Sequence, residues 1–398
     1  MIKTIAVVGA GLMGRLVALS LVRQGYQITL FDKDNKQAKN SAAYAAAGLL
    51  TPLGEAPQCE KNIVAMGFAS LKLWPDILAS LEKPVFFQQQ GSLLVSHEQD
   101  HGDYQRFDRF IKRYYPEHKI DNLNRSQLLA LEPELSRSFH HGISLPEEGQ
   151  IDNLALLDAL AHDINKTTIT WCDNTYVEKM QQEQQQGHSI YYRQQQANSQ
   201  ADLQKLDVDL VIDCRGIGAK KTASGEQANH SLNGLRAVRG EVFKLYAPDV
   251  KITRPIRLMH PRYQLYIAPK GDGRVSVGAT QIESEDCSPI TVRSAMELLS
   301  ATYSVCSGFA EANIVEQISQ LRPAFADNQP KILANNHLIQ VNGLYRHGYL
   351  ISPVVLQQVL ALVALIQNNK PLNSPCCYSD LLPISLLDEQ VIDNKLAS

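Results

Sequence analysis

A glycine-rich turn near the N-terminus limits the fold more than any other feature of the sequence. Residues 5–8 form a short apolar run, and the sequence GAGLMG, residues 9–14, follows it directly. Apolar residues then recur at helical spacing at positions 16, 18, 19 and 22, which predicts a strand, a tight turn and a helix. In a dinucleotide-binding fold the first glycine allows the turn, the second admits a pyrophosphate, and the third lets helix and strand pack closely.

A second predicted strand, Gln27 to Phe31, leads to an acid, Asp32, that lies 23 positions after Gly9. An acid at this place would bind the ribose hydroxyls of an adenosine. Together, the two strands, the glycines, the helix and the acid predict a Rossmann-type α/β domain. These residues do not distinguish FAD from NAD, so an NAD-dependent reductase remains an alternative at this point.

Length and composition narrow the class of protein. The 398 residues are enough for two domains of ~100 to 200 residues each. A formal net charge of −3, with acids and bases mixed along the chain, gives no reason to expect a nucleic-acid partner. The seven cysteines show no CxxC or metal-ligand spacing, so we expect a reducing, cytoplasmic setting and no metal. No uninterrupted apolar run reaches the ~18 residues of a membrane span.

The segment SAAYAAAGLLTP, residues 41–52, is unusually rich in small residues. Such a composition builds a helix that packs closely on a sheet, or it lets the backbone lie directly against a ligand. Tyr44 is the one large side chain among the alanines, and we expect it to point outward.

Hydrophobic periodicity predicts the remaining elements. We expect helices over 63–81, 104–131 and 154–164, a strand pair over 86–96, and a loop over 149–153. Apolar strands are expected over 209–214 and 338–341, and alternating strands over 238–243, 264–270 and 273–280. The alternating strands predict a mainly antiparallel sheet beside the parallel one. The glutamine-rich segment 181–200 is expected to form a surface hairpin. A final apolar helix should begin at Ser352 and Pro353 and run to about residue 366.

Eight segments in a fixed order carry a resemblance that covers nearly the whole chain. They are VVGAGLMG (7–14), FDKD (31–34), SAAYAAAGLLTP (41–52), VIDCRGIGA (211–219), VRGEV (238–242), YIAPKGDGRVSVGAT (266–280), LRPAFADNQP (321–330) and YRHGYLISP (345–353). In this order they resemble the FAD-dependent D-amino-acid-oxidase superfamily, and are most similar to its glycine oxidase and sarcosine oxidase branch.

The resemblance implies an FAD-binding domain of residues 1–84, 145–235 and 320–398, and a substrate domain of residues 85–144 and 236–319. It also implies which residues bind the cofactor. Gly9, Gly11 and Gly14 would hold the pyrophosphate, and Asp32, with its neighbour Lys33, would bind the adenosine ribose. The other implied cofactor-binding residues are Ser41, Ala46, Ala47, Gly48, Leu49, Gly216, Arg346, Gly348, Tyr349, Leu350 and Ile351.

The resemblance further implies four residues at the substrate. Arg322 would pair with a substrate carboxylate, for which a guanidinium offers a planar two-point fork. Tyr266, Tyr349 and His347 would lie near the substrate and the flavin ring. Two segments depart from the family pattern, namely Arg-His-Gly at 346–348, where Arg-Asn-Gly is usual, and LGEAPQCEKN after Pro52. Both border the expected active site, so the substrate is left open.

The function implied is FAD-dependent oxidation of a small amine or amino acid, glycine-like and with a place in thiamine biosynthesis. A hydride would pass to flavin N5, and O2 would reoxidise the flavin to give H2O2. One alternative is a flavoprotein maturation factor that oxygenates a tryptophan of a partner quinoprotein amine oxidase. Another is a flavin-binding subunit of a larger dehydrogenase. The oligomeric state is left open.

Overall fold

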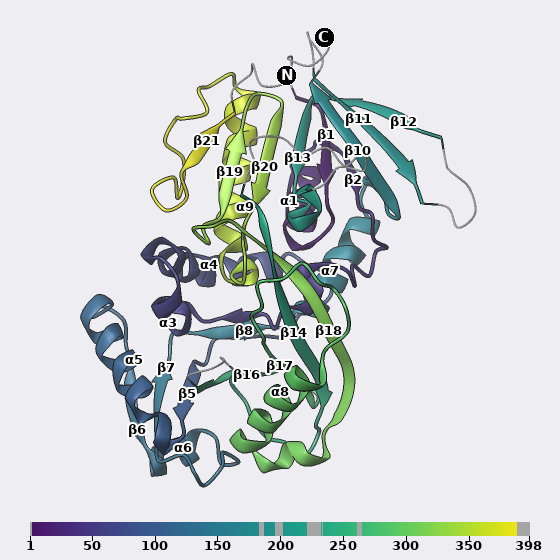
Figure 1. Cartoon of the computed structure of the whole chain (residues 1–398). Coiled ribbons are helices and arrows are strands. Elements are labelled where there is room, and N and C mark those ends of the chain that lie inside the picture. Colours follow the sequence, from purple (N-terminus) through teal and green to yellow (C-terminus); the bar gives the residue numbers. More distant parts are fainter. Residues whose placement is uncertain are drawn as a thin grey trace.

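Two large sheets dominate the molecule (Figure 1). The computed structural model describes residues 2–182, 187–195, 202–220, 232, 234–260 and 265–387. A seven-stranded sheet is mostly parallel, whereas an eight-stranded sheet is mostly antiparallel. The predicted α/β fold, with a mainly antiparallel second sheet, is confirmed. The residue limits of the two domains stay a prediction.

The seven-stranded sheet contains the predicted dinucleotide-binding unit. In order across the sheet the strands are β21 (Ile384–Leu386), β19 (Lys331–Ala334), β20 (Leu338–Asn342), β13 (Leu210–Asp213), β1 (Thr4–Val8), β2 (Gln27–Phe31) and β9 (Thr170–Cys172). Neighbouring strands are parallel except β19 and β20. Strand β1 is apolar after Thr4 because both faces of the sheet are covered.

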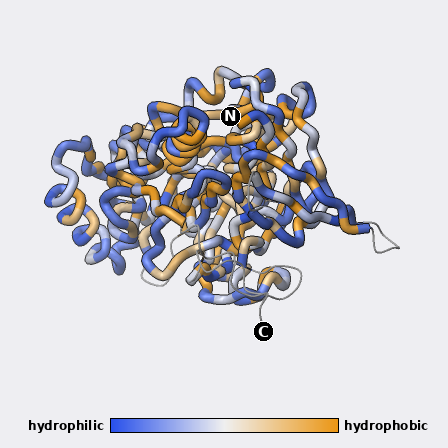
Figure 2. The backbone as a smooth tube through the Cα atoms, turned by 90° about the horizontal axis from the view of Figure 1, so that it is seen from above, coloured by the Kyte–Doolittle hydropathy of each residue, from blue (hydrophilic) through white to orange (hydrophobic). Residues whose placement is uncertain are grey.

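Helices cover one face of this sheet, and a small sheet covers the other. Ile5 and Val7 of β1 belong to the core formed with the helices, whereas Ala6 and Val8 pack against the small sheet. The covering helices are α1 (Leu12–Arg23), α4 (Lys61–Ala79), α7 (Asn153–Asn165) and α9 (Gly348–Gln367). The small sheet consists of β10 (Thr175–Gln182), β11 (His188–Gln194) and β12 (Gln204–Val208). Figure 2 shows hydrophobic residues mainly in the interior and hydrophilic residues mainly at the periphery.

The expected start of α9 at Ser352 and Pro353 was wrong, because the helix begins one turn earlier, at Gly348. Proline has no N–H to donate to the carbonyl four residues before it, here that of Tyr349. Trp74 of α4 donates its indole N–H to that oxygen at 3.1 Å. The hydroxyl of Ser70 also accepts from the N–H of Val354 at 3.3 Å. Side chains of α4 therefore satisfy the backbone around Pro353 and keep the helix intact.

Replacing Trp74 with Phe should lower the free energy of unfolding by roughly 1 to 3 kcal/mol. The ring would still fill most of the buried space, but the Tyr349 carbonyl would lose its donor. Chemical denaturation of the two proteins measures the difference. A Trp74→Phe variant as stable as the wild-type protein would show that this hydrogen bond does not support the helix.

α9 is the one helix among the described residues with the length and apolar composition to cross a membrane. In the structure 72% of its most apolar window is buried. It packs against α4 and α1 in the core beneath the parallel sheet. Its composition is therefore that of a central core helix.

The eight-stranded sheet extends below the parallel sheet in Figure 1. In order across the sheet the strands are β18 (Asn313–Ala324), β14 (Arg236–Tyr246), β17 (Arg274–Gly278), β16 (Leu265–Pro269), β15 (Ile256–Met259), β5 (Ser92–Ser96), β7 (His141–Leu145) and β6 (Asp121–Asn124). α8 (Val292–Val305) packs on one face through Leu298, Ala301 and Val305. A fourth, short sheet consists of β3 (Leu49–Leu50), β8 (Gly149–Ile151) and β4 (Phe87–Gln88).

Several local predictions were wrong where tertiary pairing decides the structure. Residues 104–131 do not form one helix but α5 (His101–Tyr114), β6 and α6 (Arg125–Leu131). The two strands within 86–96 do not pair with each other, because β4 pairs with β8 while β5 pairs with β7 and β15. Residues 149–151, expected in a loop, form β8. The hairpin expected over 181–200 is formed by β10 and β11, and it is not a surface element, because Val177 and Ile190 are buried against the parallel sheet. Residues 183–186 and 196–201 lie outside the described residues.

Candidate FAD and substrate site

A cavity of about 790 Å³ lies where the two large sheets meet. Its volume is within the range of ligand and cofactor sites. Its walls come from the β1–α1 turn, the segment 38–58, the end of β13, strands β14 to β18, and the β20–α9 connection. The carboxyl ends of β1, β13 and β20 thus open onto it, which is where open α/β sheets bind ligands.

The glycine turn fits the pyrophosphate of a dinucleotide. Gly9 has a φ of +99° and donates its N–H to the carbonyl of Phe31 at 2.8 Å. A Cβ atom on Gly14 would lie 1.8 Å from the Gly9 carbonyl oxygen, so α1 and the turn pack directly together. A Cβ atom on Gly11 would meet no atom of the described residues within 4 Å, because Gly11 faces the cavity. The turn therefore leaves open the space that a phosphate needs at the N-terminus of α1.

Asp32 lies at the cavity beside this turn. Its carboxylate accepts the backbone N–H of Ala10 and that of Asp34, the latter at 2.7 Å. Burial raises the pKa of Asp32, and the two backbone donors oppose this. The acid is thus held at the end of β2 in the position that the sequence predicted.

The alanine-rich segment lies between the cavity and the core. Ser41 caps the short helix α2 (Ala42–Ala45) by accepting the Tyr44 N–H at 3.1 Å, and the chain then extends to β3. A Cβ atom on Gly48 would lie 2.2 Å from the Ile151 carbonyl oxygen of β8. On the other side, Lys244 donates to the Ala46 carbonyl at 3.0 Å. The backbone is held on both sides, which explains the small residues.

Tyr44 does not point outward as expected. Its hydroxyl donates to the carboxylate of Glu316 on β18 at 3.0 Å, and burial raises the pKa of Tyr44 to about 12. The one large side chain of the segment therefore ties it to the edge strand of the antiparallel sheet.

Most of the predicted cofactor residues line the cavity. They are Gly9, Gly11, Asp32, Lys33, Ser41, Ala46, Ala47, Gly48, Leu49, Gly216, Arg346, Gly348, Tyr349 and Leu350. Gly14 packs beneath the turn, and Ile351 is fully buried in the core, so neither lines the cavity. Arg322, Tyr266 and His347 line it as well. The structure thus brings together residues that are more than 300 positions apart.

Arg322 of β18 lies flat across Gly240 of the neighbouring strand β14. A Cβ atom on Gly240 would lie 2.3 Å from the centre of the guanidinium, so a side chain at residue 240 would displace the guanidinium from this position. Arg322 donates to the carbonyl of Thr280 at 3.1 Å. No described residue places a carboxylate within 4.0 Å of it, in contrast to Arg257 and Arg346. The guanidinium at the cavity therefore keeps donors for an external carboxylate.

Tyr266 of β16 and Arg322 of β18 both line the cavity, and the positive charge of Arg322 partly opposes the effect of burial on the pKa of Tyr266. The Tyr266 oxygen would lie 2.9 Å from a Cβ atom on Gly278, again a place where glycine makes room for a side chain. Burial raises the pKa of Tyr266, so its hydroxyl keeps its proton at neutral pH and remains a hydrogen-bond donor. A donor hydroxyl and a guanidinium thus both line the part of the cavity where the sequence predicts the substrate.

Sequence reasoning missed the carboxylate of Glu55 and the guanidinium of Arg257. Glu55 accepts from Arg346 Nε at 2.7 Å and also pairs with Arg257. Burial opposes its charge, but Arg257 and Arg346 outweigh this and hold the pKa of Glu55 well below its usual range. Two signals were present in the sequence, namely the unusual segment after Pro52 and a charged residue in the apolar strand 256–259.

His347 and Tyr349 both line the cavity, so their place near the flavin ring stays a prediction, and each also has contacts within the protein. His347 is the N-cap residue of α9 and is 2% exposed, with Nδ1 3.9 Å from a Glu55 oxygen. Burial lowers the pKa of His347 to about 4, although Glu55 acts in the opposite direction. Tyr349 turns its hydroxyl to the carbonyls of Ala43 and Asn153, at 3.1 and 3.3 Å. The Tyr349 hydroxyl therefore holds the alanine-rich segment through a hydrogen bond to its backbone.

The lowered pKa of His347 predicts a pH dependence of stability. Between about pH 6.5 and about pH 4, the unfolded chain takes up a proton at His347 that the folded protein does not, so stability falls as the pH falls. The full difference is roughly 3 kcal/mol. His188, whose pKa burial also lowers to about 4, adds to the same loss. Urea unfolding across this range should show a smaller loss in a His347→Gln variant, and an equal loss would contradict the assignment.

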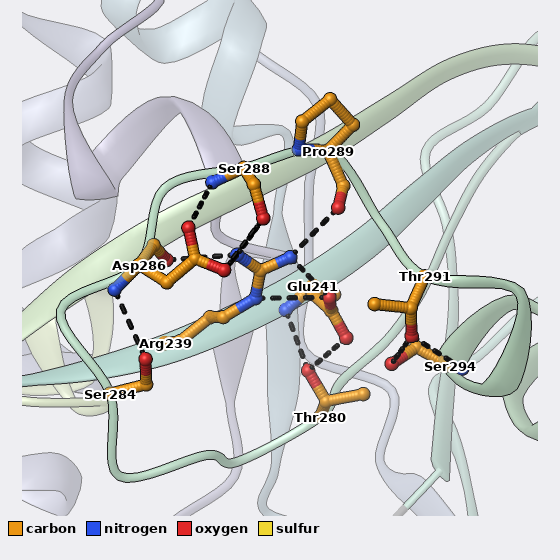
Figure 3. Close-up of polar contacts among 9 residues, drawn as sticks. All are labelled: Arg239, Glu241, Thr280, Ser284, Asp286, Ser288, Pro289, Thr291 and Ser294. Atoms are coloured by element: carbon orange, nitrogen blue, oxygen red, sulfur yellow. Dashed lines mark hydrogen bonds and ion pairs between the residues drawn. The ribbon is translucent and has the colours of Figure 1, made fainter.

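A buried arginine fixes the loop that forms one rim of the cavity. Arg239 of β14 donates to Glu241, to Asp286 and to the carbonyl of Pro289 (Figure 3). Thr280 donates to the other oxygen of Glu241 at 2.9 Å. Arg239 and Glu241 are 3% and 0% exposed, so the network is an internal anchor. It holds Thr280 and the following residue at the cavity wall.

One group of described residues has metal-ligand spacing, namely Glu82, His162 and Asp163. Each carboxylate already pairs with a base, Glu82 with Lys166 and Asp163 with Arg23 at 3.0 Å. The group lies away from the cavity and is explained by these surface ion pairs.

Comparison with known proteins agrees with this geometry. A chain from Rhizobium etli described as a putative thiamine biosynthesis oxidoreductase ThiO is 32% identical over 355 residues, which is 89% of this chain and 94% of that protein. The glycine oxidase of Geobacillus kaustophilus superposes with a TM-score of 0.76 at 20% identity, over 96% of this chain and 98% of its own. That of Bacillus cereus gives 0.77 at 19% identity, over 100% of both.

These two structural likenesses support the fold, and the family follows from sequence. The family described as FAD dependent oxidoreductase (DAO) matches residues 4–359. That span includes the glycine turn, the alanine-rich segment, Arg322 and the β20–α9 connection. The chain belongs to the FAD-dependent oxidoreductase family, and its cofactor is FAD.

Proposed function

We propose that the protein oxidises a small amine or amino acid that carries a carboxylate next to its nitrogen, with glycine as the simplest case. When bound, FAD would supply the two-electron acceptor for this oxidation, taking a hydride at N5, and O2 would be the final acceptor, giving H2O2. The chain's own residues would bind the carboxylate, direct the amine-bearing carbon toward the cofactor and exclude bulk water.

The observation that carries the proposal is Arg322. It is a guanidinium at the cavity, it lacks a carboxylate partner among the described residues, and a glycine of the next strand makes room for it. Such a fork binds a carboxylate through two parallel hydrogen bonds. Tyr266, held protonated beside it, can donate a third bond. Arg322 of β18 and Tyr266 of β16 would thus recognise a planar carboxylate from the same antiparallel sheet.

A second set of residues supports a small substrate. The Glu55 carboxylate and its two arginines occupy the wall near Arg322. Because these charges pair with one another, a large apolar side chain placed there would break buried ion pairs, which is costly. We therefore propose that glycine and N-methylglycine are better substrates than amino acids with long side chains.

The test is to mix the purified yellow protein with glycine, sarcosine and D-amino acids in air and to measure H2O2. We expect H2O2 with the two smallest compounds. If every small amine fails, the proposal is wrong. The alternative is then a maturation factor for a partner quinoprotein, which a precursor protein captured with the flavoprotein would support.

The similarity to the Rhizobium etli protein suggests a place in thiamine biosynthesis. A cytoplasmic location is proposed with it. All seven cysteines are free in the structure, which agrees with a reducing compartment.

A further inference from the structure

A buried arginine lies directly behind the glycine turn. Arg15 follows the third glycine in the first turn of α1, is 1% exposed and does not line the cavity. Its guanidinium group donates to three backbone carbonyls, those of Ala10 at 2.8 Å, Leu157 at 2.6 Å and Lys36 at 2.8 Å. Arg15 therefore joins the turn to α7 and to the segment that follows β2.

The charge of Arg15 has no acid in direct contact. No carboxylate of the described residues lies within 4.0 Å of the guanidinium. The ring of Trp171 covers it, with the ring centre 5.2 Å from the guanidinium carbon. Burial lowers the pKa of Arg15, and Asp32 is the acid that opposes this most. Because a buried cation is costly and carbonyls and an aromatic ring compensate only part of that cost, a further negative charge nearby would be stabilised.

The hydrogen bond to Ala10 also fixes the direction of the Gly11 N–H. The Ala10 carbonyl and the Gly11 N–H belong to one planar peptide unit, in which the two groups point in opposite directions. Arg15 binds the carbonyl from the buried side, so the N–H is directed away from the guanidinium, toward the cavity that Gly11 lines. In the described part of the chain this N–H has no acceptor. It is one of the free donors at the N-terminus of α1, where the helix dipole stabilises an anion.

The buried charge and the free N–H both favour an anion at the same place. FAD carries a pyrophosphate, and the glycine turn leaves room for it in front of Gly11. We propose that Arg15 is a positioning residue for this pyrophosphate: it directs the Gly11 N–H at the phosphate oxygens and holds a positive charge on the buried side of the turn. Arg15 acts through the turn, without touching the cofactor. The inference concerns the cofactor alone and does not depend on which substrate is oxidised.

Three side chains of similar length separate the two effects of Arg15. In Arg15→Gln the amide nitrogen takes the place of Nε, so the hydrogen bond to the Ala10 carbonyl can remain while the charge is lost. In Arg15→Lys a methylene group takes the place of Nε, so the charge remains while that hydrogen bond is lost. Arg15→Met lacks both.

The experiment compares ADP, which contains a pyrophosphate, with adenosine, which contains none. Each compound is titrated into the 398-residue chain after removal of its flavin, by calorimetry for ADP and by saturation-transfer NMR for adenosine. The ratio of the two Kd values isolates the pyrophosphate, because a general distortion of the adenosine site weakens both compounds. The Kd for ADP relative to that for adenosine should rise about 10-fold in Arg15→Gln and in Arg15→Lys, and about 100-fold in Arg15→Met.

Arg23 offers the matched control on the same helix. It lies at the other end of α1, donates to the Ser80 carbonyl at 3.0 Å and pairs with Asp163 at 3.0 Å. Arg23→Met thus removes the same charge and a similar contact between elements, away from the cavity. It should keep the wild-type ratio of the two Kd values.

A wild-type ratio in Arg15→Met, or an equal change of the ratio in Arg23→Met, would overturn the inference. If Arg15→Met does not fold, Arg15→Gln decides in the same way, since it retains the contact with Ala10. A wild-type ratio in that variant would show that the buried charge does not act on the pyrophosphate. These titrations need no turnover, so their result is independent of the proposed function.

Discussion

A Gly11→Val variant should fold normally and purify without FAD. A Cβ atom at residue 11 would meet no atom of the described residues within 4 Å, so we expect the fold to accommodate the substitution. The same side chain would fill the space in front of α1 that a pyrophosphate needs. We expect FAD affinity to fall at least about 100-fold, or about 3 kcal/mol, as measured by flavin absorbance and by titration of the cofactor-free protein.

Two other glycines make the test specific. Gly102 of α5 also has no atom within 4 Å of its Cβ position, and it lies away from the cavity. Gly102→Val should therefore keep its flavin. Gly14→Val, by contrast, should destabilise the whole turn because its Cβ would lie 1.8 Å from the Gly9 carbonyl. Normal flavin content in Gly11→Val would remove the glycine turn from the cofactor site.

An Arg322→Ala variant should raise the KM for glycine by one to two orders of magnitude. A charge-assisted pair with the carboxylate contributes roughly 1.5 to 3 kcal/mol. The variant would lose this stabilisation in the bound substrate and in the transition state alike, so KM should rise while kcat changes little. Steady-state kinetics measure the effect. Arg322→Lys should be intermediate, because an ammonium keeps the charge but not the planar fork.

Gly240 provides an independent check on the same contact. Its Cβ would lie 2.3 Å from the Arg322 guanidinium, so Gly240→Ala should displace the arginine and raise KM without removing the charge. An unchanged KM in both Arg322→Ala and Gly240→Ala would exclude this arginine from substrate binding.

The glycine turn and the parallel sheet around it could be predicted because their signals are local. The sequence GAGLMG and the acid after β2 both lie within the first 32 residues. The role of each glycine can be stated before the structure is known. Arg322 was predicted through a short family motif that includes its neighbour Pro323.

Other features depend on contacts that the sequence does not display. α9 continues through Pro353 because Trp74, far away in the chain, supplies the missing hydrogen bond. β8 is only three residues long and exists because β3 and β4 pair with it. Glu55 becomes part of the site only when Arg257 and Arg346 are brought to it. Helix and strand propensity and hydrophobic periodicity do not reveal such contacts between residues far apart in the sequence.

The most direct test of the account is flavin reduction in the absence of O2. Glycine and methylamine share an amine next to a C–H bond, but only glycine has the carboxylate that Arg322 is proposed to bind. We expect glycine to bleach the visible flavin absorbance in a single turnover, while methylamine at the same concentration leaves it unchanged. Bleaching by both compounds at equal rates, or by neither, would contradict the account.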